Sequence, residues 1–166
     1  MVIKRKYLIL VSLCGLLIAV DQLTKIYAVE WLHMNQSMPI WPGFFNLTLI
    51  HNPGAAFGML ANLPASLREP FFLVVPLATL AAILFAFVRL KESQAISIVA
   101  LSLIVGGAIG NLIDRVRLGF VVDFLDFHWA EDYHFPAFNA ADSAITIGVG
   151  LLMLSILLEK DNSETT

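Results

Sequence analysis

Residues 106–148 read GGAIGNLIDRVRLGFVVDFLDFHWAEDYHFPAFNAADSAITIG, and the interpretation of the whole chain depends on this stretch. It joins an apolar helical segment to a short segment of mixed polarity and then to a second apolar segment. Asp123 and Asp142 each lie where a hydrophobic segment meets a more polar one. A carboxylate at the boundary of a bilayer is costly unless it is hydrated, paired or protonated, which makes it a candidate functional residue. The sequence therefore predicts a site built on these two aspartates at a membrane surface.

The composition of the 166-residue chain is typical of a membrane protein. Hydrophobic residues make up 58% of the sequence and charged residues only 14%, whereas a soluble domain carries about 25% charged residues. The net charge of -3 and the lack of a basic stripe argue against nucleic-acid binding. The single cysteine, Cys14, lies in an apolar run, so the sequence offers no disulfide framework.

Four apolar stretches are long enough to cross a bilayer, for which about 20 residues suffice. They cover about residues 7–29, 70–88, 93–113 and 142–158. The first follows a basic cluster and resembles a signal peptide, but no small-x-small cleavage site follows it, so we expect a retained helix. The sequence predicts an all-α membrane protein with four transmembrane helices in one domain over residues 1–159, followed by a polar tail at 160–166.

The distribution of basic residues predicts the orientation of these helices. Six of the ten Lys and Arg residues lie before the first span, in the short turn between the second and third spans, or after the last span: Lys4, Arg5, Lys6, Arg89, Lys91 and Lys160. By the positive-inside rule, both termini then lie in the cytoplasm. The two long connections would face the outer side, together with the two aspartates.

The two long connections differ in character. About residues 38–60 are rich in aromatic and β-branched residues and carry turn signals at Pro42-Gly43 and at residues 52–54. This pattern predicts a small β-rich segment of short strands at the membrane interface. About residues 116–138 form a short segment of mixed polarity, which we interpret as a mobile lid loop.

Asp123 and Asp142 carry the strongest chemical hypothesis. Two carboxylates that share a site cannot both ionise easily, so one keeps a proton. The pair then supplies a general base and a general acid around one water molecule, as peptide hydrolysis without a metal requires. Two structural interpretations stay open: Asp142 precedes a helical run and suits a helix N-cap, and Asp123 suits an ordinary solvated loop residue.

Further polar residues lie near the outer ends of the first and third spans. Asp21 and Lys25 are spaced i, i+4, which suits an ion pair that is either structural or directed at a substrate. Asn111, Asp114 and Arg115 share one face of the third helix. Arg115 offers a planar fork of donors to a carboxylate or a lipid phosphate, or it anchors the helix at the interface.

Asparagines and glycines supply the remaining candidates. Asn52 and Asn139 have side chains that donate to a peptide carbonyl or satisfy a turn. Gly106 and Gly110 form a small-xxx-small pattern, which predicts close helix packing rather than chemistry.

The sequence lacks the patterns of the other hydrolase classes. Its histidines are scattered and show no HExxH spacing, so we expect no metal site and no cofactor. They are His33, His51, His128 and His134. No serine lies in a GxSxG context, which disfavours serine-type catalysis.

Five motifs together resemble one known family. They are DQLTK at residues 21–25, NPGAAFG at 52–58, GGAIGNLIDR at 106–115, VVDF at 121–124 and FNAADSAITIG at 138–148. In this order and spacing they are similar to the lipoprotein signal peptidase family, also called signal peptidase II. The resemblance covers nearly the whole chain, and the five motifs together are specific although each alone is weak.

The resemblance implies a bacterial intramembrane aspartic endopeptidase with four transmembrane helices. Such an enzyme cuts the signal peptide from a prolipoprotein just before its diacylglyceryl-modified cysteine. The resemblance further implies that Asp123 and Asp142 are the catalytic pair. The residues that support or line the site would be Asp21, Lys25, Asn52, Gly54, Asn111, Arg115 and Asn139. The β-rich segment would be a cradle on the membrane, and the second outer segment a lid over the substrate.

The expected partners are diacylglyceryl-modified prolipoproteins and membrane phospholipids, and we expect a monomer in the bacterial plasma (inner) membrane with its site at the outer, periplasmic face. As a mechanistic hypothesis, Asp142 acts as the base, because the positive end of its helix favours the ionised form, and Asp123 is the initial acid. Two other classes remain as alternatives. One is a small proton-coupled transporter that uses the acidic residues as a relay, and the other is a non-catalytic membrane assembly factor.

Overall fold

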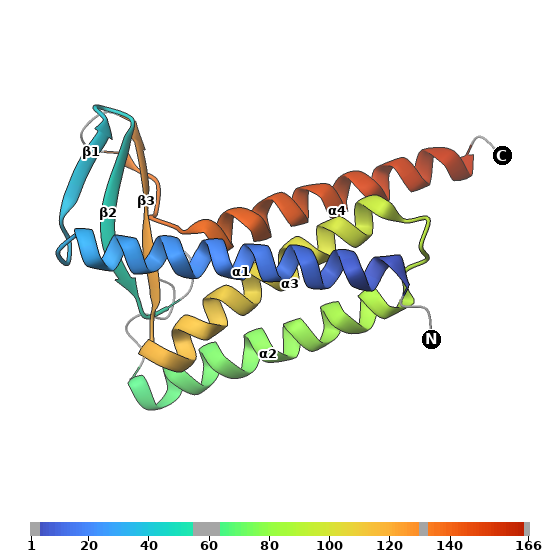
Figure 1. The fold of residues 1–166 in the computed structure, drawn as a ribbon, viewed down its shortest axis with the longest axis horizontal. Coiled ribbons are helices and arrows are strands. Elements are labelled where there is room, and N and C mark those ends of the chain that lie inside the picture. The colour runs from blue at the N-terminus through green and yellow to red at the C-terminus, as the bar shows by residue number, and fades with distance from the viewer. Residues whose placement is uncertain (1–3, 55–63, 130–132, 165–166) are drawn as a thin grey trace.

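The computed structural model describes residues 4–54, 64–129 and 133–164, and it contains a bundle of long helices with a β-sheet at one end (Figure 1). The helices are α1 (Arg5–Trp31), α2 (Ala65–Arg89), α3 (Ala95–Leu118) and α4 (Ala140–Glu164). The strands are β1 (Ser37–Trp41), β2 (Phe45–Asn52), β3 (Val121–Trp129) and β4 (Tyr133–His134). The start of α1 and the end of α4 both lie at the end of the bundle opposite the sheet (Figure 1).

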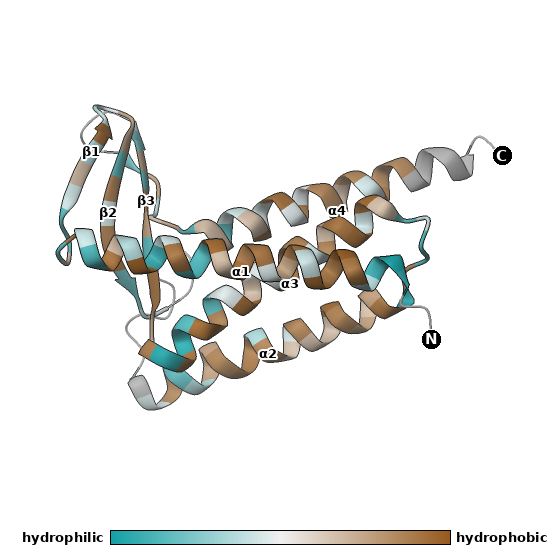
Figure 2. Ribbon diagram, in the orientation of Figure 1, coloured by the Kyte–Doolittle hydropathy of each residue, from teal (hydrophilic) through white to brown (hydrophobic). Residues whose placement is uncertain are grey.

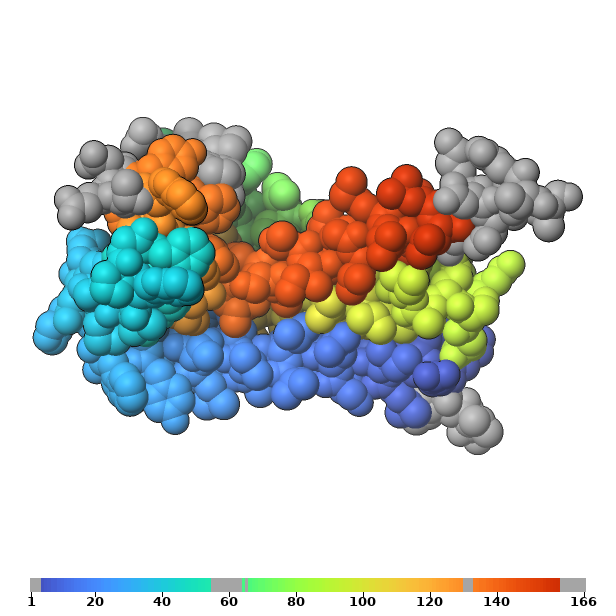
Figure 3. All heavy atoms as spheres, turned by 90° about the horizontal axis from the view of Figure 1, so that it is seen from above, coloured from blue at the N-terminus to red at the C-terminus, as the bar shows by residue number. Residues whose placement is uncertain are grey.

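All four described helices are long and apolar enough to cross a membrane. Helix α3 is the central one. In its most apolar 18-residue stretch 61% of the residues are buried, against 11–22% in the corresponding stretches of the other three helices. Figure 3 shows α3 (yellow) between α1 (blue) and α4 (red). Helices α1, α2 and α4 expose many large apolar side chains, as expected of surfaces that face lipid. Much of the ribbon of these helices is brown, the colour of hydrophobic residues, in Figure 2. The core at the end away from the sheet is formed by Phe87, Ile98, Leu101 and Ile104.

Glycines allow α3 to approach its neighbours closely, as the small-xxx-small pattern predicts. A Cβ on Gly107 would collide with the backbone oxygen of Ala141 in α4, and a Cβ on Gly148 would lie 2.8 Å from the backbone oxygen of Ala100. On the other side of α3, a Cβ on Gly106 would lie 3.2 Å from Cα of Cys14 in α1. The third helix therefore fixes the positions of both α1 and α4 by direct backbone contact.

Gly107→Ala is expected to lower the free energy of unfolding by about 1–3 kcal/mol, because the added methyl group overpacks the α3–α4 contact. The methyl group would meet the backbone oxygen of Ala141, which cannot rotate away as a side chain can. Gly150→Ala in α4 is the matched control, because its Cβ would meet nothing within 4 Å among the described residues. Denaturant unfolding in micelles measures both variants. Equal stability of the two would show that the contact is looser than described.

The sheet is antiparallel with strand order β1-β2-β3-β4. Its central pair joins β2 to β3, with Phe45 opposite Phe127 and Asn52 opposite Val121. The sheet packs on the end of α1 through Leu32, Leu49 and Val122. The two long connecting segments, far apart along the chain, thus form one layer across the end of the bundle (Figure 1).

The structure refines one expectation about the two long connections and corrects another. The four long apolar helices and a β-rich segment are confirmed, but the all-α description is incomplete, because the strands form a four-stranded sheet that is a second layer. The lid loop expected over residues 116–138 is wrong for most of its length: α3 continues to Leu118, and Val121–Trp129 form a largely buried strand. The physical reason is that residues 121–129 pair with β2, which would otherwise present an open edge. Gly119, with φ of 80°, ends α3 and allows this turn.

The helices also extend beyond the predicted spans. Helix α4 continues to Glu164, so its backbone includes residues 160–164 that the sequence suggested were a polar tail. The β-rich segment was expected over residues 38–60; its strands end at Asn52, and residues 55–60 lie outside the described part of the chain.

Candidate active site

Asp123 lies in the middle of β3 and is 2% exposed. Its carboxylate accepts two hydrogen bonds from asparagine side chains. Asn139 donates through Nδ2 to Oδ1 at 2.7 Å, and Asn52 donates through Nδ2 to Oδ2 at 3.0 Å. The interpretation of Asp123 as a solvated loop residue is therefore wrong, because this group is buried and held by two directed donors.

Asp142 is the third residue of α4, and Asn139 immediately precedes the helix. The Asp142 N–H donates to Oδ1 of Asn139 at 2.9 Å, and the Asn139 N–H donates to Oδ2 of Asp142 at 3.3 Å. This reciprocal pair has the form of a capping box, so the N-cap is Asn139 and not Asp142. Asn139, which is fully buried, therefore contacts both aspartates: its amide group bonds Asp123 while its backbone bonds Asp142.

Asn111 of α3 orients Asp142 from the other side. Its Nδ2 donates to Oδ1 of Asp142 at 2.7 Å, and its Oδ1 accepts a hydrogen bond from Nζ of Lys25 at 2.9 Å. Because an ammonium group only donates, Lys25 fixes which end of the Asn111 amide points to Asp142.

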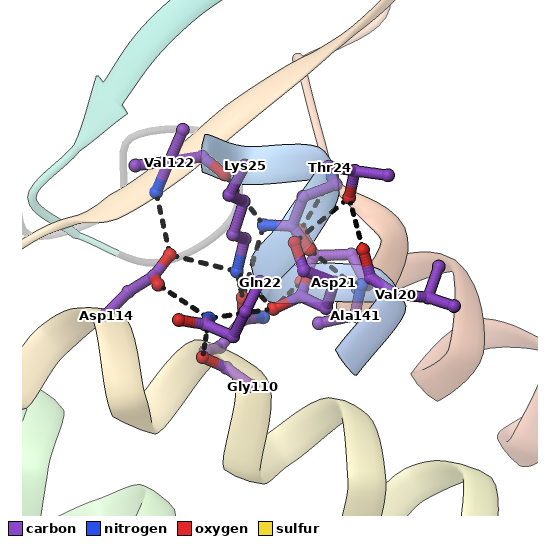
Figure 4. A network of polar contacts seen from close by, with 12 residues as sticks. Val20, Asp21, Gln22, Thr24, Lys25, Gly110, Asp114, Val122 and Ala141 are labelled. Carbon is purple, nitrogen blue, oxygen red and sulfur yellow. Dashed lines mark hydrogen bonds and ion pairs between the residues drawn. The ribbon is translucent and has the colours of Figure 1, made fainter. Parts of the chain in front are cut away.

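Lys25 is the centre of a buried ionic network between α1 and α3 (Figure 4). Its Nζ lies 2.8 Å from Oδ2 of Asp21 and 2.9 Å from Oδ2 of Asp114, and all three side chains are at most 4% exposed. Together with Asn111, these acceptors match the three hydrogens of the ammonium group. The predicted Asp21–Lys25 ion pair is thus present, with Asp114 as a second partner.

The two carboxylates of this network also hold the chain beside the two candidate catalytic residues. Asp21 accepts a hydrogen bond from the N–H of Ala141 at 3.0 Å, next to Asp142. Asp114 accepts one from the N–H of Val122 at 3.1 Å, next to Asp123 (Figure 4). Lys25 therefore connects, through Asp21 and Asp114, the two segments that carry Asp142 and Asp123.

Asp114 was recognised from the sequence only as a neighbour on the Asn111 face, and Gln22 was missed. Gln22 donates through Nε2 to Oδ1 of Asp114 at 2.9 Å (Figure 4). The spacing in NLIDR placed Asp114 on the correct helix face. Its partner on α1 became visible only once the two helices were packed together.

Arg115 holds the turn that follows β2. Its Nη2 donates to the backbone oxygen of Gly54 at 3.1 Å, and its guanidinium lies 5.6 Å from the ring centroid of Phe72. The N–H of Gly54 in turn donates to Oδ1 of Asn52 at 3.0 Å, which leaves the NH₂ group of Asn52 directed at Asp123. Arg115 and Gly54 therefore support Asn52.

Both aspartates line one cavity of about 850 Å³. Asn52, Gly54, Asn111 and Arg115 also line it, together with apolar residues that include Phe138, Ile145 and Ile147. Of the predicted site residues, Asp21, Lys25 and Asn139 do not line the cavity and lie behind its wall as supports. The structure thus brings all nine predicted residues into one connected region.

The pKa of Asp123 is raised to about 7, mainly by burial and to a smaller extent by the neighbouring charge of Asp142. The hydrogen bonds from Asn52 and Asn139 and the positive charge of Lys25 act in the opposite direction. A carboxyl group that titrates near neutral pH can both hold and release a proton during a reaction. Such a group beside a second carboxylate, in a cavity with an apolar wall, can perform general acid–base hydrolysis.

Comparison with known proteins agrees with this chemistry. Residues 13–158 match the family described as Signal peptidase (SPase) II. A lipoprotein signal peptidase of Syntrophotalea carbinolica is 47% identical over 150 residues, covering 90% of this chain and 91% of the relative. One of Geobacter metallireducens is 46% identical over 157 residues, covering 95% of each chain.

Solved structures show the same fold. A bacterial membrane enzyme determined by the in meso method superposes with a TM-score of 0.81 at 34% identity, covering 92% of this chain and 90% of the other. A second such structure gives a TM-score of 0.77 at 35% identity, covering 89% and 92%. With the family match and the relatives, this places the chain in the signal peptidase II family of bacterial membrane aspartic peptidases.

Proposed function

We propose that the protein cleaves bacterial prolipoproteins just before the diacylglyceryl-modified cysteine and that Asp123 and Asp142 are its catalytic pair. The observation that carries this proposal is the shared environment of the two carboxylates. They line the same cavity, and Asn139 forms hydrogen bonds with both.

In the proposed mechanism, the two aspartates hold one proton and one water molecule between them. Ionised Asp142 accepts a proton from the water as it attacks the scissile carbonyl carbon. Protonated Asp123 donates its proton to the developing oxyanion or to the leaving nitrogen. Asp142 suits the ionised role because it accepts hydrogen bonds from Asn111 and from the N–H of Asn139 and lies in the first turn of α4. Asp123 suits the acid role because its pKa lies near neutrality.

The cavity suits a substrate that is itself apolar and membrane-inserted. Its apolar side includes Ile145, Ile147 and Phe138, whereas its polar side carries the aspartates and Arg115. A guanidinium has five N–H donors, and the bonds of Arg115 to the backbone oxygens of Gly54 and Asn111 use two of them. We assign a further donor to a substrate backbone carbonyl or a lipid phosphate.

We further propose that both termini lie in the cytoplasm and that the sheet and the cavity lie at the outer face. The basic residues Lys4, Arg5, Arg89 and Lys91 gather at the end of the bundle opposite the sheet (Figure 1). At the sheet end, the tryptophans at positions 31, 41 and 129 are 66–76% exposed, as expected of an aromatic belt at headgroup level. A single chain supplies every proposed catalytic group, so we expect the monomer to be active.

The transporter alternative has little support in this geometry. Among the described residues, the buried aspartates do not lie at successive depths across the bilayer, as a proton relay would require, but lie near the sheet. Hydrogen bonds through Lys25, Asn111 and Asn139 link four of them: Asp21, Asp114, Asp123 and Asp142. The test is cleavage of a lipidated precursor by the purified protein in vesicles, with the same precursor lacking the diacylglyceryl group as the control. Equal cleavage of both precursors would contradict the proposed substrate.

The pH dependence of cleavage tests the assignment of Asp123 as the acid. Only its protonated form can donate, and its pKa is about 7. The rate constant kcat/KM is therefore expected to fall above pH 7, by about tenfold for each further unit. Intrinsic fluorescence at each pH checks that the protein stays folded. A rate that stays constant from about pH 6 to pH 9 would contradict the assignment.

A further inference from the structure

Two histidines and an aspartate lie together on the sheet, away from the proposed active site. Asp126 and His128 are two residues apart on β3, so their side chains project from the same face of the strand. His134 of β4 pairs directly with His128 across the two strands. One potential ligand atom from each of the three residues lies within 4.8 Å of those of the other two. The register of β3 and β4 therefore creates this cluster.

His128 has an unsatisfied polar atom at this position. The residue is only 9% exposed, and its Nδ1 is buried without a hydrogen-bond partner among the described residues. A buried nitrogen without a partner is unfavourable, because it has lost its hydrogen bonds to water and has gained none in the protein. Such a group in a native structure requires an explanation, and a bound metal ion is one of the recognised explanations.

The other two residues are arranged as supported ligands. Asp126 is 5% exposed, and its Oδ2 accepts a hydrogen bond from Oγ1 of Thr48 at 2.7 Å. Its Oδ1 lies 2.8 Å from Nδ1 of His134, whose ring stacks on that of His128 at a centroid distance of 4.9 Å. The carboxylate is thus oriented by a neighbouring strand, as carboxylate ligands of metals commonly are.

We propose that Asp126, His128 and His134 bind a divalent transition-metal ion of the zinc class. Two imidazoles and one carboxylate form a ligand set that Zn²⁺ uses, with water in the fourth position. Tetrahedral ligands at about 2.0–2.2 Å from the ion lie about 3.3–3.6 Å apart. The side chain of His134 is 47% exposed and can move to reach this geometry. Its exposure also gives the ion a path from solvent.

This site is distinct from the catalytic pair. Asp123 and Asp142 line the cavity, whereas Asp126, His128 and His134 are not among the residues that line it. The ion would not take part in hydrolysis. It would tie β4 to β3, and β4 continues directly into Phe135 and Phe138, which line the cavity. We therefore assign the metal a structural role, in which it fixes that wall of the cavity.

Metal titration of the tag-free protein in micelles tests the proposal. After chelator treatment and removal of the chelator, the wild-type protein is expected to bind one equivalent of Co²⁺ with the visible absorption of a four-coordinate ion, and Zn²⁺ should displace it. His128→Ala and His134→Ala should each weaken binding by at least about tenfold. His134→Ala alters a half-exposed side chain, so its fold is expected to survive even if that of His128→Ala does not.

Two controls complete the experiment. His33→Ala removes an exposed histidine outside the cluster and should bind Co²⁺ as the wild type does. Asp142→Asn should also bind it, because the active-site carboxylates are not the proposed ligands. Zn²⁺ should raise the melting temperature of the wild-type protein but not that of His134→Ala. Absence of binding, binding unchanged in His134→Ala, or binding lost in Asp142→Asn would each overturn the proposal.

Discussion

Asp123→Asn and Asp142→Asn are each expected to reduce the rate of prolipoprotein cleavage by about 10³-fold or more. The first substitution removes the proton donor and the second removes the base, and groups that act as a unit in catalysis cannot replace each other. A fluorogenic lipopeptide assay with the purified variants in vesicles measures the effect. Glu30→Gln, which alters an exposed carboxylate near the sheet-side end of α1, is the matched control and should retain the wild-type rate.

The two variants should stay folded, which separates loss of chemistry from loss of structure. In each variant, one carboxylate oxygen is replaced by an NH₂ group, which can donate a hydrogen bond but cannot accept one. This NH₂ group faces a neighbouring donor, because Asn52, Asn139 and Asn111 all donate to the aspartates. The cost of one such lost hydrogen bond is about 1 kcal/mol. A variant that is folded and inserted yet cleaves within about tenfold of the wild-type rate would remove that residue from the mechanism.

Asp123→Asn should also change the pH dependence of stability. The pKa of Asp123 is about 7 in the folded protein and near its ordinary value of 3.8 in the unfolded chain. Between these values the folded state binds more protons than the unfolded state, so the stability of the wild type falls as pH rises from about 4 to 7. Asp123→Asn has no ionisable group at this position, so its free energy of unfolding should lack this fall between about pH 4 and 7.

Lys25→Met is expected to lower the free energy of unfolding by about 3–5 kcal/mol, because it leaves the buried carboxylates of Asp21 and Asp114 without their cation. Lys91→Met, which alters an exposed lysine, is the control and should change stability little. Thermal or denaturant unfolding in micelles measures both. A wild-type stability for Lys25→Met would show that the network is not an essential support.

Neutralising the whole network separates the effect of charge from that of position. In the triple variant Lys25→Met, Asp21→Asn and Asp114→Asn, no unpaired charge remains, and the new amide oxygens can still accept the N–H groups of Ala141 and Val122. Most of the stability should return. Cleavage by the triple variant should still be slower than that of the wild type. The loss should appear in kcat rather than in KM, because Lys25 positions Asn111 and does not line the cavity. Recovery of kcat together with stability would limit Lys25 to a structural role.

The membrane helices could be predicted from apolar composition, but their ends could not. Helix α3 was expected to stop at residue 113, yet it continues to Leu118 through polar residues that include Asp114 and Arg115. These side chains are tolerated because α1 and the turn at Gly54 supply partners for them. Such partners come from distant parts of the chain, so a local pattern does not reveal them.

The strand β3 was missed for a similar reason. VVDFLDFHW is apolar on both faces, without the simple alternation that marks a half-buried strand. Its pairing partner, β2, lies about 70 residues earlier, as in the contact of Asn52 with Asp123. The cluster of Asp126, His128 and His134 cannot be recognised from a helical spacing such as HExxH, because it depends on strand alternation and on the register between β3 and β4.

The two aspartates at the centre of the account were found from their positions at hydrophobic boundaries and from the resemblance to a family. The local pattern left other interpretations of both residues open. The structure adds what a pattern cannot contain, namely that Asn139 forms hydrogen bonds with both carboxylates and that one cavity includes both.

Titration of Asp123 is the sharpest test of whether Asp123 and Asp142 share one site. Carbon-13 NMR of protein labelled at the aspartate carboxyl carbons should show one group with a pKa of about 7, absent from Asp123→Asn. In Asp142→Asn that pKa should fall, because the neighbouring negative charge that raises it is gone. An Asp123 that titrates near its ordinary value, or whose pKa is unchanged by Asp142→Asn, would contradict the account.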